Sequence, residues 1–168
     1  VPQGADLAAL GPLFPVFLSY VLSFVYVGIY WNNHHHMLHA TRKVSGSVLW
    51  ANLHLLFWLS LIPFTTGWMG ANRFAAAPTA LYGVVLLMAG IAFLTLQWAI
   101  MSLEGPESLL AAAVGKDLKG KISPILYLAG ILASFVHEWI AAGIYVFVAL
   151  LWLVPGKRIE RVLVSPRS

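Results

Sequence analysis

The sequence has no cysteine and few charged side chains. None of its 168 residues is Cys, and only 10% are Asp, Glu, Lys or Arg. The absence of cysteine excludes disulfides and thiolate metal sites. Since a soluble domain carries about 25% charged residues, the shortage of charge beside 60% hydrophobic residues indicates an integral membrane protein.

Several sequence motifs with known mechanisms are also missing. The chain contains no phosphate-binding loop, no nucleophile elbow, no ladder of arginines in an apolar stretch and no potassium-filter sequence Thr-Val-Gly-Tyr-Gly. A voltage sensor is therefore excluded. The net charge of +4 comes from basic residues in short segments between apolar runs. That placement is typical of a membrane orientation signal, so we expect a lipid bilayer as partner and no nucleic acid.

The chain contains five apolar stretches. A helix needs about 20 apolar residues to cross the hydrocarbon core of a bilayer. We predict an all-α integral membrane helical bundle, a single domain over 1–168, with five transmembrane helices at about 12–31, 47–69, 78–101, 122–136 and 139–154. The last two are separated by His137 and Glu138 alone, which favours a tight hairpin over one long bent helix. A short amphipathic or interfacial segment is expected at about 106–120, before a polar tail at 155–168.

The basic residues divide unequally between the two ends of this bundle. Alternating spans put nine Lys and Arg on one side and Arg73 alone on the other. By the positive-inside rule the first side is cytoplasmic, and it includes the C-terminus. Residue 1 then lies outside, which predicts a further transmembrane helix upstream. The alternative is a five-span protein with a translocated N-terminus.

Two polar clusters lie at the cytoplasmic ends of the first two spans. Asn32, Asn33, His34 and His35 follow Trp31 at what we expect to be the start of a polar loop, and Trp50, Asn52 and His54 lie near the start of the next span. Unpaired polar groups are costly in hydrocarbon, and both clusters lie at the same depth, where they can meet. Interhelical hydrogen bonds that fix helix packing and direct ligand contact both remain open for the second cluster.

The histidines between His34 and His39 also raise the question of a metal. The pairs His35/His39 and His36/His39 share a helical face and can chelate a divalent ion. A catalytic centre usually needs carboxylates as well, and the six acidic residues lie outside the span interiors. We therefore expect no catalytic residue, no functional metal, no cofactor and no enzyme activity.

The whole pattern resembles a known channel family. The run Tyr30-Trp31-Asn32-Asn33-His34-His35 is similar to the second helix of bacterial members of the transmembrane protein 175 family. Further stretches resemble the third, fourth and sixth helices of that family, namely 49–53 with 61–65, 80–83, and 151–155 with 158–160. The resemblance extends over almost the whole chain.

That resemblance implies a potassium-permeable channel subunit, homotetrameric, with six helices and cytoplasmic termini. In the family the first helix lines the pore, and the five spans here correspond to the second through sixth. Pore-lining and selectivity residues would lie on that first helix, outside this sequence. The implied role of Asn32, Asn33, His34, His35, Trp50 and Asn52 is to pack behind the pore helix, with His54 as an extra polar contact.

Two alternatives of other classes remain. One is a metal-dependent membrane enzyme that uses the His34–His39 cluster. The other is a non-conducting accessory membrane protein without a pore helix.

Overall fold

The described part of the chain is built from helices. The computed structural model describes residues 11–39, 41, 43–105 and 118–153, and no strand occurs among them. The helices are α1 (Phe14–His39), α2 (Gly46–Ala71), α3 (Ala76–Glu104), α5 (Leu118–Ser134) and α6 (Glu138–Leu153). The predicted tail at 155–168 and most of the interfacial segment at 106–120 lie outside the described residues, and 118–120 begin α5.

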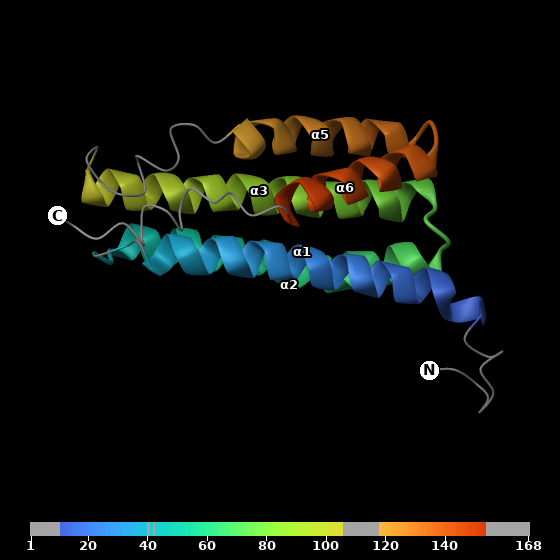
Figure 1. The fold of residues 1–168 in the computed structure, drawn as a ribbon, viewed down its shortest axis with the longest axis horizontal. Coiled ribbons are helices and arrows are strands. Elements are labelled where there is room, and N and C mark those ends of the chain that lie inside the picture. Colours follow the sequence, from blue (N-terminus) through green and yellow to red (C-terminus); the bar gives the residue numbers. More distant parts are fainter. Residues whose placement is uncertain (1–10, 40, 42, 106–117, 154–168) are drawn as a thin grey trace, which may run out of the picture.

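The helices lie side by side, and each runs opposite to its predecessor in the chain (Figure 1). The central helix is α3, which packs against α2, α5 and α6, while α1 packs against α2 and α6. The C-terminal ends of α1 and α3 therefore lie at one end of the bundle with the N-terminal ends of α2 and α5, and the turns α2–α3 and α5–α6 lie at the other end. The count of Lys and Arg on the two sides of the membrane assumed this alternation of helix direction.

Local sequence explains where the helices begin and end. The Oγ of Ser45 accepts a hydrogen bond from the backbone N–H of Val48 at 3.4 Å, which caps the start of α2. Gly105 follows α3 with a φ of 91°, a value that glycine adopts without a Cβ clash. Between α5 and α6, the N–H of His137 bonds to the carbonyl of Ala133. This turn makes the two helices the expected hairpin.

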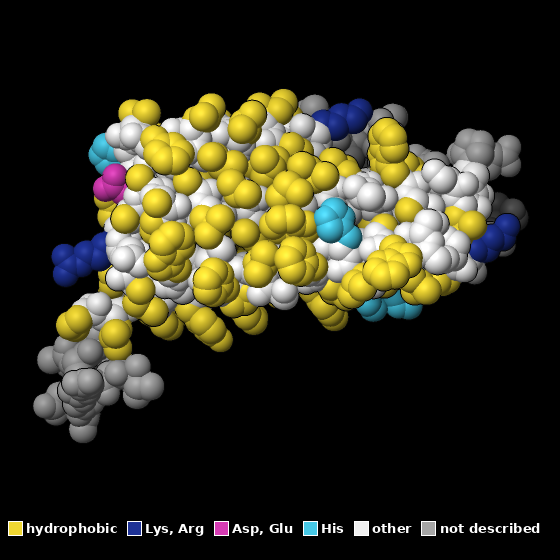
Figure 2. Space-filling model, turned by 180° about the vertical axis from the view of Figure 1, so that it is seen from behind, with side chains coloured by type: hydrophobic (Ala, Val, Ile, Leu, Met, Phe, Trp, Pro, Cys, Tyr) yellow, Lys and Arg dark blue, Asp and Glu magenta, His cyan; other side chains and the backbone are white. Residues whose placement is uncertain are grey.

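Among the described residues, three helices are long and apolar enough to cross a membrane, namely α1, α2 and α3. A further apolar helix, α6, is shorter at 16 residues. The predicted all-helical fold is thus confirmed for the described residues, whereas the number of five transmembrane helices stays a prediction. Figure 2 shows one face of the molecule, where hydrophobic side chains predominate along the middle, with a histidine among them, while Lys and Arg lie toward the ends and one edge.

One boundary was predicted wrongly. The polar loop expected from Asn32 is helical through His39, so α1 has 26 residues. The loop was predicted from the polarity of these residues alone. In the structure, two polar side chains at this end of α1 instead donate hydrogen bonds to backbone carbonyls one turn earlier. The amide Nδ2 of Asn33 donates to the carbonyl of Ile29 at 2.8 Å, and the Thr41 hydroxyl donates to the carbonyl of Met37 at 2.9 Å.

Candidate functional site

The two polar clusters meet through one hydrogen bond between α1 and α2. The Nε2 of His34 lies 2.6 Å from the Oδ1 of Asn52, and both side chains are half-buried. An amide oxygen can only accept, so this His nitrogen carries the proton and donates. A direct polar bond therefore ties the ends of the first two helices together.

The other members of the clusters do not join that bond in the described structure. The side chains of Asn32, His35 and Trp50 are exposed, and Trp50 is 74% exposed. Trp31 stacks on the ring of His35, with centroids 5.4 Å apart and planes 16° from parallel. Among the described residues, the two clusters are thus joined by the His34–Asn52 pair, and Asn32, His35 and Trp50 are exposed.

His54 has a hydrogen-bond partner on its own helix. Its Nε2 accepts a hydrogen bond from the indole Nε1–H of Trp58 at 2.9 Å, one turn along the same helix. The side chain is exposed. Among the described residues, the interhelical bond considered for this histidine does not form, because the side chain lies on the outer face of α2.

The interior contains a group of buried tyrosines that the sequence reasoning missed. Five of the six tyrosines are buried, on four different helices: Tyr26, Tyr30, Tyr82, Tyr127 and Tyr145. Each ring is apolar enough for a membrane core, and each hydroxyl requires a partner there. The i,i+4 spacing of Tyr26 and Tyr30 was a signal for one shared face, but the other three come from distant helices.

Backbone carbonyls satisfy several of these hydroxyls. Tyr26 donates to the carbonyl of Tyr145 at 2.5 Å, and Tyr145 donates to the carbonyl of Thr79 at 3.3 Å. Tyr82 packs edge-on against both tyrosine rings. These contacts connect α1, α3 and α6 around one centre.

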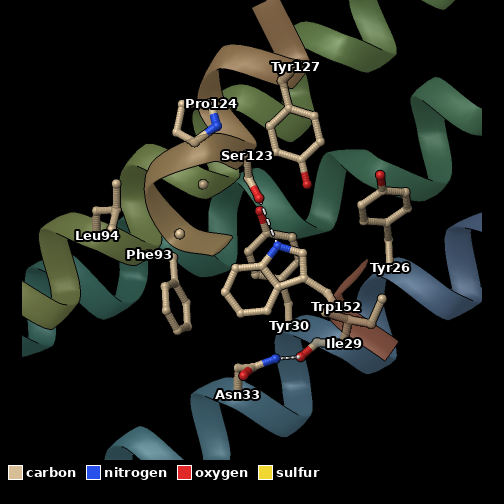
Figure 3. Close-up of a pocket in the computed structure, with 12 residues that line it drawn as sticks. Tyr26, Ile29, Tyr30, Asn33, Phe93, Leu94, Ser123, Pro124, Tyr127 and Trp152 are labelled. Carbon is tan, nitrogen blue, oxygen red and sulfur yellow. Dashed lines mark hydrogen bonds between the residues drawn. The ribbon is translucent and has the colours of Figure 1, made fainter. Parts of the chain in front are cut away.

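A cavity of about 40 Å³ lies between α1, α3, α5 and α6. The residues that line it are Tyr26, Ile29, Tyr30, Asn33, Gly90, Phe93, Leu94, Gly120, Ser123, Pro124, Tyr127 and Trp152. Figure 3 shows the hydroxyl of Tyr127 pointing toward Tyr26, with Asn33 at the opposite end of the group. A water needs at least about 10–15 Å³ and two to four polar partners, so the cavity has the space and the chemistry for two or three waters.

The wall of the cavity is closed by a hydrogen-bonded pair on α5 and α6. The indole Nε1–H of Trp152 donates to the Oγ of Ser123 at 2.8 Å, and that hydroxyl donates to the carbonyl of Lys119 at 2.8 Å. The Nζ of Lys119 in turn donates to the carbonyl of Leu151. These bonds hold the end of the hairpin together beside the cavity.

The chemistry available at these sites is packing and hydrogen bonding. Among the described residues, no group of three or more His, Cys, Asp or Glu gathers closely enough to hold a metal ion. The sites contain hydroxyls, amides and imidazoles, without a carboxylate among them. They can fix helices and hold small polar molecules.

Comparison with known proteins gives a consistent family. The sequence profile described as "Endosomal/lysosomal potassium channel TMEM175" matches residues 1–63. A protein named a potassium channel from Chryseobacterium sp. (strain P1-3) is 52% identical over 163 residues, which cover 97% of this chain and 85% of the relative.

Two more distant relatives carry the same name. A potassium channel of Streptomyces collinus is 30% identical over 94 residues, 54% of this chain and 46% of its own length. One of Chamaesiphon minutus is 24% identical over 152 residues, 85% of this chain and 73% of its own length. No solved structure matches the chain. From the 52% identity along nearly its full length, the chain belongs to the TMEM175 potassium channel family.

Proposed function

We infer that this chain is a potassium channel subunit and not an enzyme. The observation that carries this function is the 52% identity, over 97% of the chain, to a protein named a potassium channel. The apolar helices α1 to α3 and the hydrophobic surface in Figure 2 support a membrane location. Conduction would be passive, through a pore whose apolar constriction opposes ions by dewetting.

We further propose that four copies of the chain form the channel. In each copy, the five helices α1, α2, α3, α5 and α6 would span the membrane around an upstream pore helix. The exposed amide of Asn32 on α1 supports this arrangement. Since an amide facing hydrocarbon is costly, a protein segment is a better neighbour for this side chain than lipid.

In this arrangement, the polar clusters support the pore helix from behind and do not touch the permeant ion. The end of the bundle with the histidines would face the cytoplasm, together with the C-terminus, in a bacterial inner membrane. The nine basic residues that the alternation assigns to that end support the orientation. The intact mass of protein from the native gene tests the upstream helix, and native mass spectrometry tests the four-copy assembly.

The function is tested by potassium flux. The protein encoded by the full native gene is reconstituted into liposomes loaded with potassium, with empty liposomes and the Chryseobacterium relative as controls. We expect flux above empty liposomes and a preference for potassium over sodium. An inert protein, under conditions where the relative conducts, would favour the accessory-protein alternative.

A further inference from the structure

The structure divides the described histidines by their partners. His34 is bonded to Asn52, and His54 accepts from Trp58. His137 lies in the turn between α5 and α6, at the other end of the bundle. The remaining three lie on the last turns of α1: His35, His36 and His39.

Within this group, His35 and His39 have the closest rings. They are one helical turn apart, with ring centroids 4.5 Å from each other, whereas the rings of His35 and His36 are 5.9 Å apart. Both His35 and His39 are exposed. A zinc ion binds imidazole nitrogen at roughly 2.0–2.1 Å, so two rings that share an ion have centroids within about 5 to 6 Å of each other.

One of the two rings is held in place before any ion binds. The indole of Trp31 stacks nearly parallel on one face of His35. Stacking covers a face of the ring and leaves the edge nitrogens accessible. The His35 ring therefore keeps an orientation in which its nitrogens remain available, which lowers the entropic cost of chelation.

We propose that His35 and His39 form a two-ligand site for a late first-row transition metal ion. Imidazole donors suit copper, nickel and zinc. Hard ions such as calcium and magnesium prefer oxygen ligands, and the His35–His39 pair offers none from its own side chains. Among the described residues, no third His, Cys, Asp or Glu joins this pair. For such nitrogen donors, Cu²⁺ binds more tightly than Zn²⁺.

The test uses tag-free protein in detergent at about pH 7.5, where an unperturbed imidazole is mostly neutral. Cu²⁺ is titrated and followed by calorimetry, and the electron paramagnetic resonance spectrum reports the nitrogen donors. We expect one tight site per chain with two imidazole nitrogens. His39→Ala should weaken that site by about tenfold or more, because chelation by two ligands is lost.

Two controls make the assignment specific to this pair. His137→Ala, at the other end of the bundle, should leave the affinity unchanged. His36→Ala removes the ring between the two ligands in sequence and should also leave it nearly unchanged. The proposal is wrong if His39→Ala binds Cu²⁺ as tightly as the parent protein, if His36→Ala loses as much affinity as His39→Ala, or if the spectrum shows a single nitrogen donor.

Discussion

Replacing Gly130 by alanine is expected to destabilise the bundle. Gly130 lies on α5 directly against the ring of Tyr145 on α6. A Cβ at this position would overlap the ring's Cε1 and lie 3.0 Å from Cζ and 3.2 Å from Cδ1. Such distances are shorter than van der Waals contact between carbon atoms, which is about 3.5–4.0 Å. Either the ring or the helix α5 must move.

The Tyr145 ring has little freedom to move. Its side chain is fully buried, with its hydroxyl on the carbonyl of Thr79. A Cβ at Gly83 of α3, on the neighbouring helix, would also overlap this tyrosine. Because the ring lies against glycines of two helices, the added methyl is overpacking, which typically costs about 1–3 kcal/mol.

Gly143 on α6 supplies the matched control. A Cβ there meets nothing within 4 Å, so Gly143→Ala gains the helix propensity of alanine, up to about 1 kcal/mol, without a clash. The difference between the two variants isolates the cost of the contact. At about 2–4 °C per kcal/mol for a chain of this size, we expect Gly130→Ala to unfold roughly 2–12 °C below Gly143→Ala.

The assay is thermal unfolding of the purified protein in one detergent, followed by intrinsic fluorescence for the parent and both variants. If Gly130→Ala unfolds at the same temperature as Gly143→Ala, Tyr145 does not fill the space against α5. The packing of the hairpin described here would then be wrong.

Two further predictions concern the interhelical bond and the cavity. Asn52→Ala leaves the N–H of His34 without its acceptor, so we expect the free energy of unfolding to fall by about 0.6 kcal/mol, and by at most about 1.7 kcal/mol, with an unchanged preference for potassium over sodium. Ser60→Ala, which removes an exposed hydroxyl on the same helix, is the control, and an altered ion preference would contradict the supporting role. Gly90→Ala places a Cβ at ordinary contact distance, 3.7 Å from the Tyr30 hydroxyl, beside the cavity. We therefore expect this variant to unfold at or above the unfolding temperature of the parent and Gly83→Ala to unfold below it, whereas the reverse order would show that the cavity is filled by protein.

Close helix contact at glycines could be anticipated only in part. The sequence contains Gly83, Gly90, Gly130 and Gly143 in apolar stretches, where small residues allow helices to approach. The structure uses the first and third against Tyr145, places Gly90 beside the cavity, and leaves Gly143 open among the described residues. Which glycine is a contact depends on where a large side chain from another helix lies, and composition does not contain that information.

The sequence alone determined the class, the helices and their alternation. Charge-free apolar runs cannot satisfy their backbone in a bilayer except as helices, so the runs predicted α2, α3, α5 and α6 to within four residues at each end. Counting residues along each span also placed the polar ends of α1 and α2 at one depth, where they can meet, while the pairing of His34 with Asn52 came from the structure.

Only the tertiary structure decided which side chains share the interior. Tyrosines from four helices converge on one centre, and four helices enclose the cavity beside them. Helix rotation about its own axis determines these meetings, and in a membrane both the lipid face and the packed face are apolar, so the hydrophobic pattern does not reveal that rotation. For the same reason, only the packed structure shows that His34 bonds to Asn52 on α2, whereas the rings of His35 and His39 lie close to each other.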